Sequence, residues 1–264
     1  MGSITSTRVR YSSAVVGMVA SWIIGAAIIV IKAPWSEALG YADAPARIMV
    51  IYLASIFVWL IPALIATYLS TRNPKWLAPP GKYVAGAKYK VFSPRTLTAI
   101  AILIALYAVS GLPTGVNIDV PAIVASFASV FYGPLVVFVT FIVGAPFRWL
   151  IGGMPWALPA LVPFFGMLDA SIWALGSYIY WYFLRDGKFT GRKRTIAKVL
   201  CVVAMIAIHY FGWGIYSQIL RNPWPASLLG IIRVITTWYP TCVAFVIIGA
   251  VIGEEAYKAR ALER

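Results

Sequence analysis

The sequence predicts an all-α, polytopic helical membrane protein of about eight transmembrane helices, two followed by a six-helix bundle. The chain is 61% hydrophobic and only 11% charged, with a mean hydropathy of +0.85, whereas soluble domains are about 25% charged. Apolar runs recur along the chain, and most reach the roughly 18–20 residues that cross a hydrocarbon core of about 30 Å as a helix. A soluble fold could not bury this much apolar surface.

The apolar runs lie near 13–31, 47–69, 97–112, 120–147, 157–184, 196–217 and 229–252. The first run is expected to be a retained helix rather than a cleaved signal. The run at 120–147 holds Tyr132-Gly133-Pro134 in its middle. Gly-Pro is a turn signal, but membrane helices also tolerate a proline kink. Local sequence alone therefore leaves a kinked helix and a helical hairpin equally open.

The placement of basic residues favours the hairpin. The segment 71–96 contains six basic residues and no acid, and the segment 185–198 contains six basic residues and one acid. Under the positive-inside rule both segments and both termini are cytoplasmic, so an even number of helices must separate the two segments. Counting 120–147 as two helices, near 120–131 and 133–150, gives four crossings and satisfies the rule.

Four parts are predicted along the chain. They are an N-terminal transmembrane hairpin at 1–70, a basic cytoplasmic linker at 71–96, a six-helix membrane bundle at 97–253 and a cytoplasmic tail at 254–264. The expected location is the cell membrane, multi-pass, with both termini cytoplasmic. The net charge of +14 falls mostly in the basic segments and the tail, so membrane lipids, and not nucleic acid, are the expected partners.

Four features between about 95 and 253 occur in a particular order. A basic residue precedes a small-residue helix, RTLTAIAILIALYAVSGLP, and the connection TGVNID leads to a short helix that starts at a proline. The aromatic-Gly-Pro turn of FYGPLVVFVTFIVG follows, and then a Gly-rich aromatic helix, PALVPFFGMLDASIWALGSYIYWYFLR, which ends in a basic loop. In this order the block resembles the S component, the substrate-binding membrane subunit, of energy-coupling factor (ECF) vitamin transporters. The N-terminal two-helix extension and the linker have no counterpart in that six-helix plan.

The resemblance implies a pocket that opens outward and partner subunits that supply coupling and ATP hydrolysis. It also places a small-residue face of the first bundle helix against the coupling subunit, and Ala101 and Ala105 fit that face. Small residues let helix backbones approach closely in lipid. Alanine is also common in any apolar helix, so both interpretations of these two residues stay open.

Ionisable side chains inside membrane spans cost about 2.5–3.5 kcal/mol at the centre on insertion scales and indicate function by default. Asp169 is the only acid well inside an apolar run, Arg148 and Arg233 fall on the predicted outer half, and His209 is the only histidine. The predicted substrate-binding residues are Arg148, Asp169, Trp173, His209, Trp213 and Arg233. Further tryptophans considered for the same pocket are Trp156, Trp224 and Trp238.

An arginine fork suits a planar carboxylate or phosphate, and aromatic faces suit a ring. The expected substrate is therefore a small vitamin-like or anionic nutrient. Alternative interpretations remain for the same residues. Asp169 could neutralise an arginine, the tryptophans could form an interfacial belt, and His209 could make a satisfied polar contact between helices.

No catalytic residue, cofactor or metal site is predicted. The chain has no HExxH motif and no Walker glycine loop, and a lone histidine cannot make a His-rich copper or zinc site. Cys201 and Cys242 lie in separate apolar runs and show no metal-ligand spacing.

The leading functional hypothesis is therefore a substrate-capture subunit of a small-molecule uptake transporter, energised by separate ATP-hydrolysing subunits and not itself an enzyme. A non-catalytic structural subunit of a multi-subunit membrane complex is the alternative. A membrane enzyme that uses Asp169 and the arginines ranks lowest, because one buried acid lacks a base partner.

Overall fold

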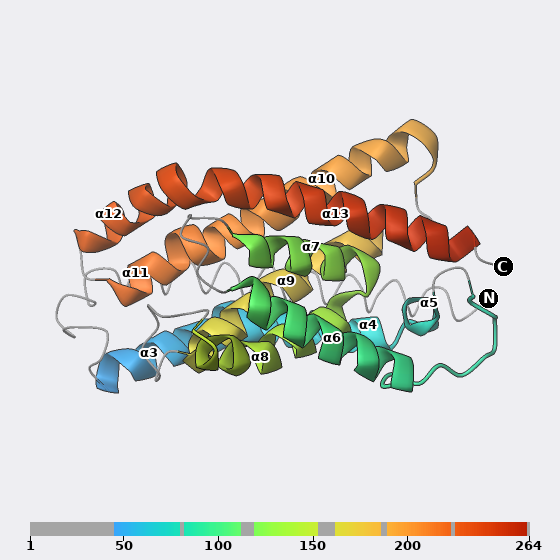
Figure 1. Cartoon of the computed structure of the whole chain (residues 1–264), viewed down its shortest axis with the longest axis horizontal. Helices are drawn as coiled ribbons and strands as arrows, with labels where there is room; N and C mark the ends of the chain where they lie inside the picture. Colours follow the sequence, from blue (N-terminus) through green and yellow to red (C-terminus); the bar gives the residue numbers. More distant parts are fainter. Residues whose placement is uncertain are drawn as a thin grey trace.

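A computed structural model of the chain describes residues 45–79, 82–111, 119–152, 162–185, 189–222 and 225–262. Within these ranges every regular element is helical and no strand occurs, so the all-α prediction is confirmed there (Figure 1). The first predicted helix, near 13–31, and the tryptophans Trp156 and Trp224 lie outside the described residues.

Most helices match the predicted runs. In chain order the elements are α3 (Pro45–Ser55), η1 (Ile56–Leu60), α4 (Ile61–Thr71), α5 (Pro74–Leu77), α6 (Pro94–Ser110), α7 (Val120–Phe131), α8 (Pro134–Leu150), α9 (Val162–Leu184), α10 (Gly191–His209), η3 (Tyr210–Tyr216), α11 (Ser217–Arg221), α12 (Ala226–Arg233), η4 (Val234–Trp238) and α13 (Tyr239–Leu262). The three η elements are π-helical segments that run directly into the α-helices on either side. Among the described residues, these junctions join the shorter elements into three continuous helices, over 45–71, 191–221 and 226–262.

Among the described residues, four helical stretches are long and apolar enough to cross a membrane: Val50–Thr71, Val162–Leu184, Gly191–Leu220 and Ala226–Leu262. α6 and α8 are apolar but have only 17 residues each, and α7 has only 12, which is about 18 Å of helix. Eight residues of α7 are buried by neighbouring helices, so this short helix is covered by protein. The arrangement is compatible with a polytopic helical membrane protein.

The connection between α7 and α8 confirms the predicted hairpin. α7 ends at Phe131 and α8 begins at Pro134. Gly133 between them has a φ of +91°, a conformation that residues with a side chain rarely adopt. A Cβ atom on Gly133 would also lie 3.2 Å from the Trp181 ring. Backbone conformation and packing therefore both favour glycine at this turn.

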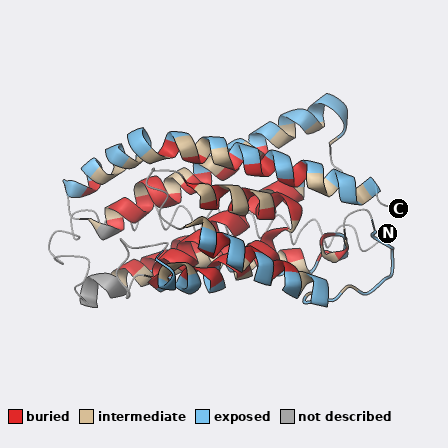
Figure 2. Ribbon diagram, in the orientation of Figure 1, coloured by how far each residue is buried: buried red, intermediate tan, exposed pale blue. Residues whose placement is uncertain are grey.

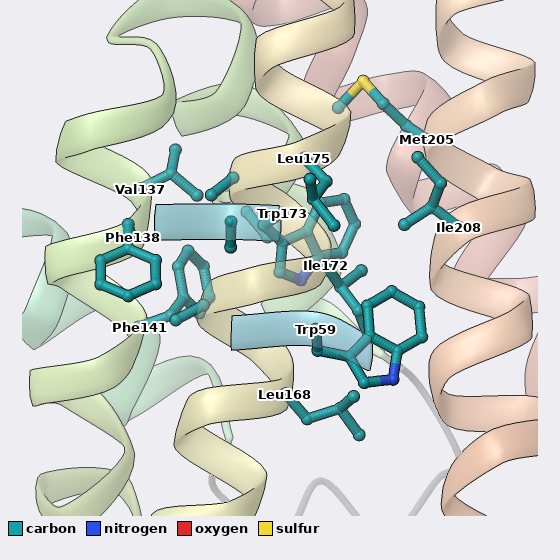
Figure 3. Packing of buried hydrophobic residues seen from close by; sticks show 14 of the residues in the cluster. Trp59, Val137, Phe138, Phe141, Leu168, Ile172, Trp173, Leu175, Met205 and Ile208 are labelled. Carbon is teal, nitrogen blue, oxygen red and sulfur yellow. The ribbon is translucent and has the colours of Figure 1, made fainter. Parts of the chain in front are cut away.

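α9 is the central helix of the molecule, and 19 of its 23 residues are buried. It packs against α7, α8 and α10 and also against α3, η1 and α4. In Figure 3, Trp173 of α9 lies between Phe141 of α8 and Ile208 of α10, with Trp59 of η1 beside them. The helix at 45–71 therefore belongs to the same core as the predicted six-helix bundle, and it does not form a separate unit.

The basic segments gather at one end of the bundle, as the count of crossings predicts. α5 of the linker, the start of α10 and the C-terminal end of α13 lie at the same end in Figure 1. A cavity of about 290 Å³ at this end is lined by Lys90 of the linker, Gly133 of the α7–α8 turn and Arg260 of α13, among others. Residues 254–262, predicted as a separate tail, continue α13 as helix.

A buried ion cluster ties three helices together at this basic end. Glu254 of α13 is 5% exposed and forms ion pairs with Arg185 at 2.9 Å and with Lys198 at 2.7 Å. Arg194 of α10 lies 3.6 Å from the same carboxylate, and the Tyr180 hydroxyl donates a hydrogen bond to it at 2.8 Å. We call these five residues the Glu254 cluster.

α7 packs on α13 at very short range through two glycines, Gly249 and Gly253. A Cβ atom on Gly249 would overlap the backbone oxygen of Ile123, and one on Gly253 would lie 2.9 Å from that of Phe127. The pair forms a GxxxG pattern, which lets two helix backbones come into contact. The opposite side of α13 is exposed along much of its length (Figure 2).

Candidate functional site

A small cavity lies at the other end of the bundle, near the point where α6 ends and α7 begins. Its volume is about 50 Å³. Its lining comes from α6, α7, α8, α9, α10, η3, η4 and the residue before α7: Tyr107, Asp119, Pro121, Ala122, Phe141, Arg148, Asp169, Trp173, His209, Trp213 and Trp238. Pockets for drug-sized ligands measure about 300–1,000 Å³, so this cavity fits only a compact solute or a few water molecules.

Asp169 is the centre of the polar network in this cavity. Its side chain is 4% exposed and accepts two hydrogen bonds, from the Tyr107 hydroxyl at 2.5 Å and from Trp213 Nε1 at 2.7 Å. Such bonds compensate for removing a carboxylate from water. They also fix both carboxylate oxygens, because each oxygen accepts from a different helix.

Tyr107 connects Asp169 to Arg148. Arg148 Nη1 donates to the Tyr107 oxygen at 3.2 Å, and the guanidinium lies over the Tyr107 ring at 5.0 Å from its centre. Gly111 provides the space for this arginine, since a Cβ atom there would overlap the guanidinium. The arginine and the carboxylate therefore share one phenol and offset each other's charge. We call Tyr107, Arg148, Asp169 and Trp213 the Asp169 cluster.

His209 lies on the aromatic side of the cavity. Its ring centre is 4.9 Å from that of Trp173 and 5.7 Å from that of Trp238. Its Nδ1 atom is 3.4 Å from the sulfur of Cys242. His209 is the last residue of α10, and Trp238 is the last residue of η4, so both side chains are positioned at junctions between α- and π-helix. Such junctions are frequent at functional sites.

Five of the six predicted substrate-binding residues line this single cavity: Arg148, Asp169, Trp173, His209 and Trp213. Arg233 does not, because it lies exposed on α12. The described lining of the cavity therefore includes one arginine where the sequence suggested two. Trp238, considered as a further candidate, also lines it.

Tyr107 was not predicted from the sequence. Asp119, the last residue of the TGVNID connection, was considered there either as part of a gate over an outward pocket or as an ordinary polar loop residue. Tyr107 sits within an apolar run, where a tyrosine gives no sign of its hydrogen bonds. Asp119 precedes the short helix α7, and its side chain is 7% exposed. The feature of the sequence that could have identified Asp119 is its position directly before a helix that is too short to cross a membrane.

Ala101 and Ala105, the predicted partner-docking residues, are both exposed on α6. They lie among large apolar side chains that are also exposed: Leu97, Ile102, Leu106 and Val109. The bundle buries the other side of α6, through Leu103, Tyr107 and Ala108. The strip with the two alanines is therefore free to face lipid or another subunit.

The larger cavity at the basic end differs in chemistry. Its charged lining residues, Lys90, Arg95 and Arg260, are all exposed, and none of the described residues that line it is a buried ionisable side chain. The small cavity is the better candidate site because its ionisable groups are buried and held in place by other residues.

Comparison of the chain with protein-family models, with curated proteins and with solved structures found no match. Evidence for function therefore comes from the residues of the cavity.

Proposed function

We propose that the chain is the substrate-capture subunit of a small-molecule uptake transporter, energised by separate ATP-hydrolysing subunits. The observation that supports this proposal is the convergence of Arg148, Asp169, Trp173, His209 and Trp213, from three separate stretches of helix, on one cavity in an apolar bundle. Ionisable residues at such a position are costly and indicate a solute pathway or binding site.

The position of the cavity fits capture from outside the cell. The basic segments lie at the opposite end of the bundle, and the positive-inside rule places that end in the cytoplasm. Asp169, Arg148 and Asp119 then lie in the outer half of the membrane. A solute could reach them from the external side without crossing the full bilayer.

The lining also narrows the chemistry of the solute. Arg148 supplies the only arginine among the described lining residues, and its Nε atom is buried without a hydrogen-bond partner among them. A carboxylate or phosphate group suits that donor. The volume of about 50 Å³ favours a solute smaller than a vitamin.

Ligand binding by the purified full-length chain in detergent tests this proposal. Native mass spectrometry would show a co-purified molecule, and thermal unfolding would be followed across a panel of small carboxylates, phosphates, amino acids and vitamins. We expect one compact anionic or zwitterionic solute to raise the unfolding temperature. Arg148→Gln should abolish that rise, whereas Arg233→Gln, on the exposed side of α12, should keep it.

Absence of any bound molecule and of any thermal shift would favour the alternative, a non-catalytic structural subunit of a multi-subunit membrane complex. Two observations support this alternative: the small size of the cavity and the exposed apolar strip of α6. An equal loss of binding in Arg148→Gln and Arg233→Gln would also contradict the assignment of the cavity.

A further inference from the structure

Three potential metal ligands meet beside the small cavity. Asp119 immediately precedes α7, His209 is the last residue of α10, and Cys242 lies in the first turn of α13. One carboxylate oxygen, one ring nitrogen and the sulfur all lie within 4.8 Å of one another. The three residues are 7%, 2% and 1% exposed, respectively, so they meet inside the bundle and not on its surface.

The spacing and the ligand types suit a transition metal. Zn²⁺ binds oxygen, nitrogen and sulfur ligands at about 2.0–2.3 Å, which places ligand atoms about 3.3–3.8 Å apart around a tetrahedral ion. The sulfur–nitrogen distance of 3.4 Å between Cys242 and His209 already falls in that range. Magnesium and calcium prefer all-oxygen sites, so a set with imidazole and thiol discriminates against them.

The balance of charge around the cavity also favours a cation. The described lining residues include two acids, Asp119 and Asp169, but only one arginine, Arg148. Arg148 and Asp169 share the Tyr107 hydroxyl, which leaves the charge of Asp119 without a second buried cation among the lining residues. A divalent ion bound by the Asp119 carboxylate and a Cys242 thiolate would make this buried region neutral, and buried charges need such compensation.

We propose that Asp119, His209 and Cys242 bind a single divalent transition-metal ion of the Zn²⁺ or Co²⁺ class. Three protein ligands leave the fourth tetrahedral position open, and the cavity adjoins that position because Asp119 and His209 both line it. A water molecule or an anionic group could occupy it. This site goes beyond the proposed function, since the ion binds whether or not the chain captures a solute.

Cobalt titration of the purified, metal-free full-length chain tests the site. Thiolate-bound Co²⁺ gives a charge-transfer absorption band that oxygen and nitrogen ligands do not produce. We expect that band to saturate at one ion per chain and Zn²⁺ to displace it. Cys242→Ser should remove the band and weaken Zn²⁺ binding by at least about 10-fold.

Cys201→Ser is the matched control, because Cys201 is a buried cysteine on α10 that does not belong to the cluster. That variant should keep the band and the affinity. His209→Ala and Asp119→Asn should weaken Zn²⁺ binding while leaving the elution profile of the metal-free protein unchanged. Absence of the band in the wild-type protein, or its persistence in Cys242→Ser, would overturn the proposal.

The titration also separates the two proposals. Arg148→Gln should abolish solute binding and keep the cobalt band, because Arg148 is not among the proposed ligands. Cys242→Ser should abolish the cobalt band without requiring any solute to be identified. A negative result in one assay therefore leaves the other assay informative.

Discussion

The two ends of the bundle each bury charged side chains, but cations outnumber carboxylates at one end and carboxylates outnumber cations at the other. In the Glu254 cluster one carboxylate faces three cations and a tyrosine. Among the described lining residues of the small cavity, two carboxylates face a single arginine. Glu254 lines neither of the two cavities described here, whereas both Asp119 and Asp169 border a hollow.

The difference indicates two different uses of buried charge. The Glu254 cluster joins the end of α9, the start of α10 and α13 by direct ion pairs, so it is a structural tie between helix ends. The Asp169 cluster instead borders the small cavity, which Tyr107, Arg148, Asp169 and Trp213 all line. Among the described residues, the Nε atom of the arginine lacks a hydrogen-bond partner in both clusters. The cavity is what distinguishes the two clusters, since the proposed binding site needs both side chains held in position and space beside them.

The largest effect is expected from Glu254→Gln. This change leaves Arg185, whose side chain is 3% exposed, as a buried charge without its carboxylate. Removing one partner of a buried pair costs about 3–5 kcal/mol, so thermal unfolding in detergent should show a marked loss of stability. Glu255→Gln is the control, because that side chain is 64% exposed and should change stability by less than about 1 kcal/mol. Equal effects of the two variants would contradict the structural role.

Gly249→Ala tests the seam between α7 and α13, the helix that carries both Cys242 and Glu254. The added Cβ atom would collide with the backbone of Ile123, and overpacking of this kind costs about 1–3 kcal/mol. Because the seam runs between the two ends, we expect both thermal stability and cobalt binding to fall. Val251→Leu, on the exposed side of α13, should leave both unchanged. If Gly249→Ala changed neither thermal stability nor cobalt binding, the two helices would be shown to separate easily at this seam.

Asp169→Asn should separate binding from stability. Asparagine keeps the shape but loses the charge. Because its NH₂ group only donates, its single amide oxygen cannot replace both carboxylate oxygens that accept from Tyr107 and Trp213. We expect a modest loss of stability, about 1–2 kcal/mol, and complete loss of the solute-dependent thermal shift. A variant that retained the thermal shift would show that Asp169 has only a structural role in the cluster. Ser171→Ala, also buried on α9, controls for perturbation of the helix and should keep the shift.

The smallest effect on the fold is expected from Ala101→Leu and Ala105→Leu. Both residues are exposed, so thermal stability should change by less than about 0.5 kcal/mol. If this strip of α6 contacts a coupling subunit, co-purification of that subunit should fall sharply, because leucine prevents close approach of helices. Ala108→Leu, on the buried side of α6, should instead destabilise the isolated chain by about 1–3 kcal/mol. Unchanged co-purification would indicate that the strip faces lipid.

The sequence predicted the helices well because hydropathy and charge placement are strong signals in membrane proteins. The count of crossings identified the turn at Gly133, which the structure places between α7 and α8. The π-helical segments could not be predicted, since no composition distinguishes Val234–Trp238 from the helix on either side. The contact between the helix at 45–71 and α9 could not be predicted either. The apolar residues of that helix would suit contact with lipid as well as contact with α9.

The candidate site was predictable to the extent that buried charge is rare. Asp169 and Arg148 stood out because few ionisable residues lie inside the apolar runs. Tyr107 and Asp119 did not, because their roles depend on which helix ends meet. The metal ligands illustrate the same limit: Asp119, His209 and Cys242 lie 90 and 33 positions apart in the chain, so no spacing motif could connect them.

The long helix over Ala226–Leu262 has a mechanical consequence. Its 37 residues span about 55 Å, whereas the hydrocarbon core is only about 30 Å thick, so part of the helix must project beyond it. From Cys242 to Leu262 the helix is about 30 Å long, and a tilt of about 5° at the cavity would move its far tip by about 3 Å. A rigid α13 would therefore turn a small movement beside the cavity into a larger displacement at its C-terminal end.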